Sequence, residues 1–206
     1  MEREYKFYGW ESADVHPVNE EYRLIKDPKA LYDILSDIWC SETCAPRMRD
    51  EWTKENKTLG QCSITAFLVQ DIFGGKVYGV PRSGGNFHCY NEVDGRTFDL
   101  TSEQFGDEVL VYEDNPEQSR EEHFKKEEKH DRYLYLKAEL EKKLKKLSLI
   151  PLVDAAAKGS IEAAEKLALG YYHGDFGERN LAKAKKWGSY AAKHGSQAAG
   201  ELLLLL

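Results

Sequence analysis

The sequence lacks any run of apolar residues close to the roughly 20 that a membrane-spanning helix needs. Its leucine-rich end, Leu202–Leu206, is far shorter. The first residues, Met1–Tyr5, do not follow the charged-then-apolar pattern of a secretory signal. Cysteine is scarce as well: four among 206 residues do not suggest a disulfide framework. We therefore expect a soluble, cytoplasmic protein with reduced thiols and no membrane association.

The sequence also lacks an excess of basic residues. It has 29 Lys and Arg against 36 Asp and Glu, a net charge of −7, whereas a nucleic-acid surface needs a positive field. Its glycine pairs, Gly74-Gly75 and Gly84-Gly85, lead into neither a Gly-Lys-Ser/Thr step nor a Gly-x-Gly-x-x-Gly run. We predict no nucleic-acid partner and no cofactor.

Two segments carry the apolar spacing of helices. The first runs from Leu31 to Ile38, after Asp27 as a cap and Pro28 at the first helical position. The second runs from Ile64 to Ile72 and ends at Gly74-Gly75. Because Gly60 permits a tight turn, the first turn of this second helix is expected to contain Gln61 and Cys62.

A β-hairpin follows. Lys76–Val80 is expected to be a strand, and Phe87–Val93 and Arg96–Leu100 alternate around Asp94-Gly95, a strong two-residue turn. After the hairpin, Thr101 and Gln104 fit a capping box for a short helix.

The hairpin predicts which side chains share a face. If Val93 pairs with Arg96, His88 and Asp99 become diagonal neighbours about 7–8 Å apart at the backbone, with Tyr90 on the same face. Asn91, the other residue able to orient a histidine, points to the opposite face. A cysteine at a helix N-terminus beside an imidazole favours its thiolate form. The sequence therefore favours a Cys62–His88–Asp99 constellation.

Two alternatives stay open. Cys62 is also compatible with a structural role in the core, since cysteine is often buried. A metal site built from Cys40, Cys44, Cys62, His88 and Cys89 is less favoured, because His88 and Cys89 are adjacent on a strand and point to opposite faces. We predict no metal.

The end of the sequence repeats itself at an offset of 36 residues. Gly159 then aligns with Gly195, and six further positions agree. Such agreement is typical of stacked helical pairs. The six pairs are Ala155 and Ala191, Ala156 and Ala192, Ser160 and Ser196, Ala163 and Ala199, Glu165 and Glu201, and Leu167 and Leu203.

This segment resembles the SEL-one-like repeat family, a relative of tetratricopeptide repeats. The resemblance is carried by Ala163, Leu167, Ala168, Tyr171, Tyr172, Gly174, Gly177, Ala182, Ala184, Trp187, Ala191, Ala192 and Gly195. It implies an α-solenoid with a protein-binding surface. Only about one and a half repeats are present, fewer than the roughly three that stand alone. The leucine-rich end, exposed unless covered, suggests a contact between two copies through the C-terminal helix.

A charged segment joins the two parts. Arg120 to Lys146 mixes Glu and Lys, with Tyr133 and four leucines spaced as a helical seam. Ser148 to Pro151 is the expected boundary. We therefore predict an α+β domain at 1–148 and an α-α repeat segment at 149–206.

The arrangement of a helical cysteine with a histidine and a carboxylate on strands resembles the papain-like superfamily, particularly its transglutaminase-like branch. More locally, the segment from Pro28 to Leu147 resembles the YunG-like bacterial family. It departs mildly from that pattern at Cys89, where an aromatic residue is expected. The carrying motifs are Leu59-Gly60-Gln61-Cys62-Ser63, Phe73-Gly74-Gly75, His88 with Asn91, Asp94-Gly95, Asp99-Leu100-Thr101, Gln104-Phe105, Trp39, Glu42-Thr43, Arg49 and Trp52.

These resemblances imply a papain- or transglutaminase-like body with a short antiparallel sheet and flanking helices, followed by an all-α repeat tail. They imply a cysteine hydrolase or acyltransferase acting on amides or thioesters, with catalytic Cys62, His88 and Asp99. Gln61 and Tyr90 are candidates for binding substrate or stabilising an oxyanion. The repeat tail is expected to bind a protein or peptide partner. The alternative is a catalytically inactive papain-like adaptor.

Overall fold

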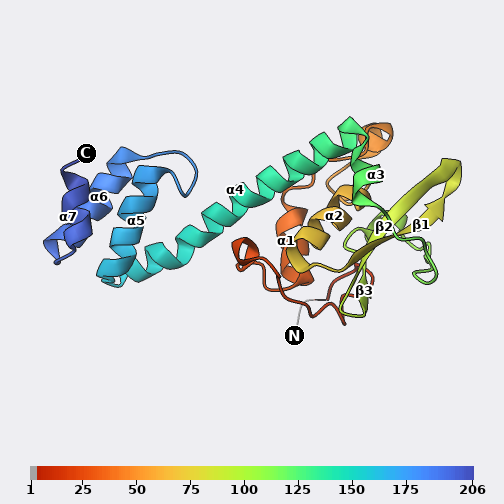
Figure 1. Ribbon diagram of the computed structural model, residues 1–206, viewed down its shortest axis with the longest axis horizontal. Coiled ribbons are helices and arrows are strands. Elements are labelled where there is room, and N and C mark those ends of the chain that lie inside the picture. The colour runs from red at the N-terminus through yellow and green to blue at the C-terminus, as the bar shows by residue number, and fades with distance from the viewer. Residues whose placement is uncertain (1–3) are drawn as a thin grey trace. The chain divides into compact units, whose positions relative to one another are not determined.

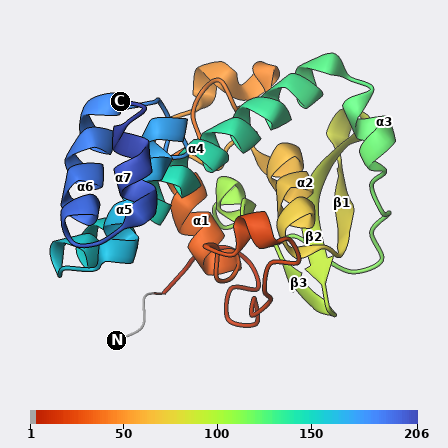
Figure 2. The same ribbon diagram turned by 60° about the vertical axis from the view of Figure 1, so that its left-hand side comes forward.

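The computed structural model describes residues 4–206, which divide between Leu140 and Glu141 into two compact units (Figures 1 and 2). The long helix α4, Glu127–Ala157, contributes residues to both units and contains Pro151 in its interior. The helix thus continues through Ser148–Pro151, the stretch at which the sequence places its boundary. Within the described residues no helix is long and apolar enough to cross a membrane.

The first unit is built on a three-stranded antiparallel sheet in the order β1-β2-β3. The strands are β1 (Lys76–Arg82), β2 (Asn86–Val93) and β3 (Arg96–Phe98). Helix α2 lies along β1 and β2 (Figure 1). This confirms the predicted α+β class. The helices are α1 (Pro28–Ser36), α2 (Cys62–Phe73) and α3 (Arg120–Phe124), with 3₁₀ turns at Glu20–Tyr22, Pro46–Glu51, Ser83–Gly85 and Ser102–Phe105.

The two predicted helices form for the predicted reasons. The Asp27 side chain accepts a hydrogen bond from the Ala30 N–H at 2.8 Å, which satisfies one of the unpaired amides at the start of α1. Helix α2 ends at Gly74, whose φ of 76° lies in the left-handed region that favours glycine. Because α2 is apolar on nearly all sides, most of its residues are buried.

The hairpin register is confirmed, but its second strand is shorter than predicted. Val93 pairs with Arg96 across the Asp94-Gly95 turn, in which both residues have a positive φ. The last strand ends at Phe98 instead of Leu100. The reason is a long-range contact: the Asp99 N–H donates to the Tyr8 carbonyl at 3.0 Å, so Asp99 pairs with the N-terminal segment and not with β2.

The predicted capping box at Thr101 and Gln104 is wrong. The 3₁₀ turn Ser102–Phe105 does form, but no side chain caps it. The Thr101 hydroxyl instead donates to Asp99 Oδ1 at 3.0 Å, and Gln104 Nε2 donates to the Thr101 carbonyl at 2.8 Å. Both polar side chains are therefore used to fix the chain around Asp99.

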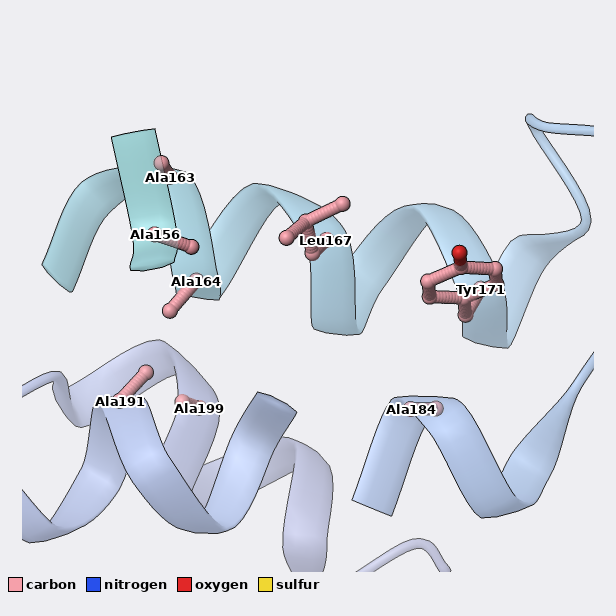
Figure 3. Close-up of a cluster of buried hydrophobic side chains, with 8 residues drawn as sticks. All are labelled: Ala156, Ala163, Ala164, Leu167, Tyr171, Ala184, Ala191 and Ala199. Atoms are coloured by element: carbon pink, nitrogen blue, oxygen red, sulfur yellow. The ribbon is translucent and has the colours of Figure 1, made fainter. Parts of the chain in front are cut away.

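The second unit is helical, as predicted. It contains the end of α4 followed by α5 (Ile161–His173), α6 (Leu181–Lys193) and α7 (Gln197–Leu203). Its core consists mainly of alanines, and small side chains allow helices to approach closely (Figure 3). The core residues are Ala156, Ala163, Ala164, Leu167, Tyr171, Ala184, Ala191 and Ala199.

The 36-residue offset reappears as repeated local geometry. Gly159 and Gly195 both have a positive φ, 97° and 105°. Each precedes a serine cap: Ser160 Oγ accepts from the Ala163 N–H, and Ser196 Oγ accepts from the Ala199 N–H. The two segments thus start their helices in the same way, at positions that the 36-residue offset aligns.

Candidate functional site

Cys62 is the first residue of α2 and is partly exposed. The backbone turns into the helix at Gly60, where φ is +69°. A side chain at this position would meet Cys44 Sγ at 2.7 Å and the Ala45 nitrogen at 2.9 Å. Only glycine therefore fits the turn without strain. At the start of a helix the thiol faces the positive end of the helix dipole, which favours a thiolate.

The turn before Cys62 is held from three sides. Gly60 donates its N–H to Gln104 Oε1 at 3.3 Å. Its carbonyl accepts from the Ala45 N–H at 3.0 Å and from Arg132 Nη2 at 2.9 Å. Arg132 also donates twice to the Thr43 carbonyl. The position of Cys62 is thus fixed by groups far apart in the sequence.

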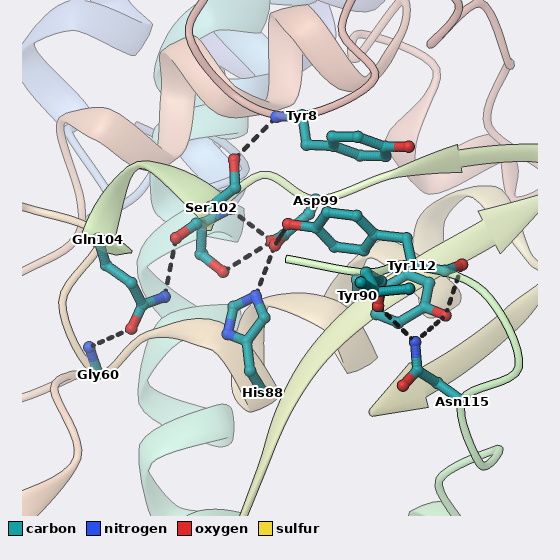
Figure 4. A network of polar contacts seen from close by, with 11 residues as sticks. Tyr8, Gly60, His88, Tyr90, Asp99, Ser102, Gln104, Tyr112 and Asn115 are labelled. Atoms are coloured by element: carbon teal, nitrogen blue, oxygen red, sulfur yellow. Dashed lines mark hydrogen bonds and ion pairs between the residues drawn. The ribbon is translucent and has the colours of Figure 1, made fainter. Parts of the chain in front are cut away.

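His88 and Asp99 form a buried pair. His88 Nε2 lies 2.5 Å from Asp99 Oδ2, and the two side chains are 2% and 1% exposed. Asp99 also accepts from the Thr101 N–H at 2.9 Å, the Thr101 hydroxyl at 3.0 Å and the Tyr112 hydroxyl at 2.9 Å. Figure 4 shows these groups converging on the carboxylate. The carboxylate is therefore held in one orientation and fixes the imidazole.

The other nitrogen of His88 is unpaired. Nδ1 is buried and has no hydrogen-bond partner among the described residues. The edge of the Phe105 ring meets the imidazole at 4.6 Å between centroids, with the planes 87° apart. His88 and Cys62 line the same cavity of about 600 Å³, together with Gly60, Cys89, Gln104 and Phe105.

Cys62 and His88 lie close enough to change one another's protonation. Burial alone would lower the pKa of His88, but the Asp99 carboxylate and the Cys62 thiol raise it to about 10. Burial would raise the pKa of the Cys62 thiol, but the neighbouring imidazole lowers it below its ordinary value, assisted by a hydrogen bond from the Cys89 backbone. Both changes favour a thiolate beside an imidazolium.

The two candidate oxyanion or substrate residues point elsewhere. Gln61 is fully buried, and its Nε2 donates to the Cys40 carbonyl at 3.1 Å. The Tyr90 hydroxyl donates to the Tyr112 carbonyl at 3.1 Å and accepts from Asn115 (Figure 4). Neither residue is among those that the structure places in the cavity wall. Their suggested roles stay predictions that these contacts do not favour.

Asn91 lies where the hairpin argument puts it. Its Nδ2 donates to the Ala66 carbonyl of α2 at 2.9 Å, on the face of β2 opposite to His88. The choice of Asp99 over Asn91 as the partner of His88 thus follows the observed bonds. For the metal alternative, no three His, Cys, Asp or Glu side chains of residues 4–206 gather as ligands would.

Sequence reasoning missed three residues that hold this site. Tyr112 bonds Asp99, Tyr8 pairs with it through the backbone, and Arg132 ties down the turn at Gly60. Tyr8 and Tyr112 lie in segments with no periodic pattern, so no signal marks them. Arg132 lies in a charged helical segment in which an arginine is ordinarily solvated, yet it is only 6% exposed.

The fold and the site together define an α+β protein with a cysteine at a helix N-terminus and a buried histidine–aspartate pair. A family model described as "YunG protein" matches residues 27–145, which include all three side chains. The Uncharacterized protein YunG of Bacillus subtilis (strain 168) is 37% identical over 91 residues, covering 44% of this chain and 72% of that protein. The chain therefore belongs to the YunG family. No solved structure shows a significant match.

Proposed function

We propose that this protein is a cysteine-dependent hydrolase or acyltransferase that acts on amides or thioesters. The observation that carries the proposal is the buried His88–Asp99 pair beside Cys62, which lies at the start of α2. Nucleophile, base and orienting carboxylate are the three groups that nucleophilic acyl transfer requires.

The proposed cycle begins with the thiol proton of Cys62 transferred to His88 Nδ1. The thiolate sulfur then forms a bond to the carbonyl carbon, and the carbon–oxygen double bond opens to an oxyanion. The Cys62 backbone N–H is one donor for that oxyanion, because the first amide of a helix has no intrahelical acceptor. As the oxyanion collapses, the bond to the leaving group breaks and His88 protonates that group.

The acyl-enzyme is resolved by a second nucleophile. Water, deprotonated by His88, attacks the thioester and releases a carboxylic acid and the thiol; an amine would instead yield an amide. We favour hydrolysis over acyl transfer. Throughout, Asp99 orients the ring and stabilises its positive charge without taking the proton.

The wider architecture belongs to this proposal as well. A papain- or transglutaminase-like body accounts for a helical cysteine facing a histidine and a carboxylate from a hairpin. The helices α5 to α7 are proposed to be SEL-one-like repeats that bind a protein or peptide. Leu204 and Leu205, 87% and 69% exposed, are available to a second copy of the chain.

The second candidate is an inactive adaptor with the same fold, and one observation favours it. His88 Nδ1 makes no hydrogen bond of ordinary geometry among the described residues, although the Cys62 thiol lies close enough to raise the pKa of His88. An active site whose thiol and base tighten only with substrate would look the same.

Mass spectrometry after incubation with p-nitrophenyl acetate separates the two candidates. We expect an acetyl thioester on Cys62 in the wild type and none in Cys62→Ser. Cys40→Ser is the matched control, since Cys40 is also partly exposed but does not line the cavity. Acetylation that persists in Cys62→Ser, or none in the wild type, would favour the adaptor.

A further inference from the structure

The wall of the cavity beside Cys62 is basic, although the chain as a whole carries a net charge of −7. One carboxylate, Glu128, lies among its lining residues. The cations that line it are five: Arg47, Arg82, Lys126, Lys129 and Arg132. Such a wall raises the local concentration of anions.

Two of the five cations are already paired. Arg82 forms a two-pronged bridge to Glu108, with distances of 2.6 and 3.0 Å. Arg132 lies 3.3 Å from Glu128 and uses its remaining N–H groups on backbone carbonyls. These two side chains hold the protein together and have little charge left for a ligand.

The other three are not neutralised. Arg47 donates to the uncharged Asn86 side chain at 2.9 Å. Lys129 Nζ donates to His123 Nδ1 at 3.3 Å, and burial lowers the pKa of His123 to about 3, so this partner is uncharged. Among residues 4–206, Lys126 has no carboxylate within ion-pair distance.

This grouping is electrostatically unfavourable without a ligand. Lys126 directly precedes α4 and Lys129 lies in its first turn, three residues on, so their charges repel one another. A helix N-terminus also disfavours cations. Burial lowers the pKa of Lys129 and the charge of Lys126 lowers it further, an effect that Glu128 and the nearby thiols offset only in part. A bound anion would relieve both repulsions.

We propose that the Cys62 site takes acyl compounds that carry an anionic group near the reacting carbonyl, and that Arg47, Lys126 and Lys129 bind that group. The group is a carboxylate or a phosphate. This inference rests on the proposed function. The charge of the anionic group stays unchanged while the carbonyl carbon exchanges its bond to the leaving group for a bond to the sulfur of Cys62.

Two alkylating reagents that differ in charge test the proposal. Iodoacetate is an anion and iodoacetamide is neutral, while both transfer a similar group to a thiolate. The rate of each reagent at Cys62 is measured by mass spectrometry. The ratio of the iodoacetate rate to the iodoacetamide rate is then compared with the same ratio for the neutral thiol N-acetylcysteine amide. We expect the ratio at Cys62 to be about fivefold higher and to fall as salt is added.

Charge-neutralising variants locate the effect. The double variant Arg47→Gln, Lys126→Gln should lower the ratio about threefold, toward that of the free thiol. Lys126→Gln alone should lower the ratio less, and Lys125→Gln is its matched control. It removes one charge from the neighbouring position, but Lys125 pairs with Glu122 and does not line the cavity. A ratio equal to that of the free thiol, or one that Lys125→Gln lowers equally, would overturn the proposal.

Added anions that slow the alkylation of Cys62 show which kind of anionic group the cations bind. Succinate that slows the iodoacetamide reaction at Cys62 identifies a carboxylate, inorganic phosphate that does so identifies a phosphoryl group, and protection by neither overturns the proposal. If the cations served only the thiolate, the double variant would slow both reagents equally and leave their ratio unchanged, which also overturns it.

If the proposed function is wrong but the anion site is real, the experiments give a different result. In that case Cys62 reacts slowly with iodoacetamide at neutral pH, whatever the ratio between the two reagents. The anion site is then tested through the melting temperature. A rise with phosphate or succinate in the wild type that is smaller in Lys126→Gln supports it, and no rise overturns it.

Discussion

Asp99 receives four hydrogen bonds, from His88 Nε2, the Tyr112 hydroxyl, and the hydroxyl and N–H of Thr101. A buried carboxylate needs such bonds, because an unpaired buried charge is costly. The same bonds leave the carboxylate one orientation. At the scale of residues, the direction of the His88 ring is therefore set by side chains that never touch Cys62.

Tyr112→Phe removes one of these bonds and keeps the ring. We expect the free energy of unfolding to fall by about 1–2 kcal/mol, measured by urea denaturation, because Asp99 loses a hydroxyl donor. Tyr8→Phe is the matched control: the Tyr8 ring stacks on Tyr112 at 4.0 Å, and its hydroxyl makes no hydrogen bond within residues 4–206. Equal losses in both variants would contradict the role of the Tyr112–Asp99 bond.

The pH dependence of the free energy of unfolding shows whether the His88 proton comes from the Cys62 thiol. In Cys62→Ser, the Asp99 carboxylate alone still raises the pKa of His88 in the folded protein, whereas the unfolded chain releases that proton near 6.5. The stabilisation from this proton is thus complete below pH 6.5. It should fall as pH rises above 6.5, by up to about 1.4 kcal/mol per pH unit.

The wild type should behave differently over the first part of that range. Folded, the pair holds one proton on His88; unfolded, between pH 6.5 and about 8.5, it holds one on Cys62. The proton counts are equal, so stability should stay flat there and fall only above about pH 8.5. Denaturation at several pH values measures both curves, and parallel curves would refute the thiolate–imidazolium pair.

The His88–Asp99 contact could be predicted because a two-residue turn fixes every register position before it. Val93 opposite Arg96 places Asp99 diagonal to His88 by counting alone. The role of Thr101 could not be predicted in this way. Its hydroxyl fits a helix cap by sequence, but in the structure it bonds the Asp99 carboxylate, while the Asp99 N–H bonds the distant Tyr8 carbonyl.

Gly60 connects the residue scale to the element scale, because it sets where α2 begins. Gly60→Ala forces a side chain into the left-handed region and against Cys44 and Ala45. We expect a loss of about 2–4 kcal/mol in the free energy of unfolding, combining backbone strain with overpacking. The measurement is chemical denaturation.

Gly106→Ala provides the control for this substitution. Gly106 also has a positive φ, 57°, but a side chain there would meet nothing within 4 Å. Its loss should be confined to backbone strain, about 1–2 kcal/mol. If Gly60→Ala costs no more than Gly106→Ala, the packing of Gly60 against Cys44 does not position α2.

Elements with a strong apolar period were predictable, and elements that depend on distant partners were not. Helices α1 and α2 carry their own caps and stripes, so local sequence determines them. Tyr8 and Asp99 are far apart in the sequence, and their pairing ends β3 at Phe98. No local pattern reports such a contact.

At the scale of the whole molecule, the family match and the site coincide. The match covers residues 27–145, whereas α5, α6 and α7 lie beyond it. The site residues all belong to the unit that ends at Leu140, and the alanine-rich helical core belongs to the other. The chemistry proposed for Cys62 should therefore not depend on that core.

Leu167→Ala tests this separation. Leu167 is fully buried in the helical core, so its truncation should destabilise α5 to α7 by about 2–5 kcal/mol. Hydrogen exchange followed by mass spectrometry should show faster exchange in these helices and unchanged protection in β1 and β2. Faster exchange in both regions would show that the two units unfold together.

The most direct test of the proposed thiolate is the pH dependence of Cys62 alkylation by iodoacetamide, followed by mass spectrometry in the wild type and in His88→Ala. The wild type should show an inflection well below the free-thiol value of about 8.5. His88→Ala should move that inflection to 8.5 or above, because the imidazole lowers the pKa of the thiol. An inflection at or above 8.5 in the wild type, or one that His88→Ala leaves unchanged, would contradict a Cys62–His88 pair.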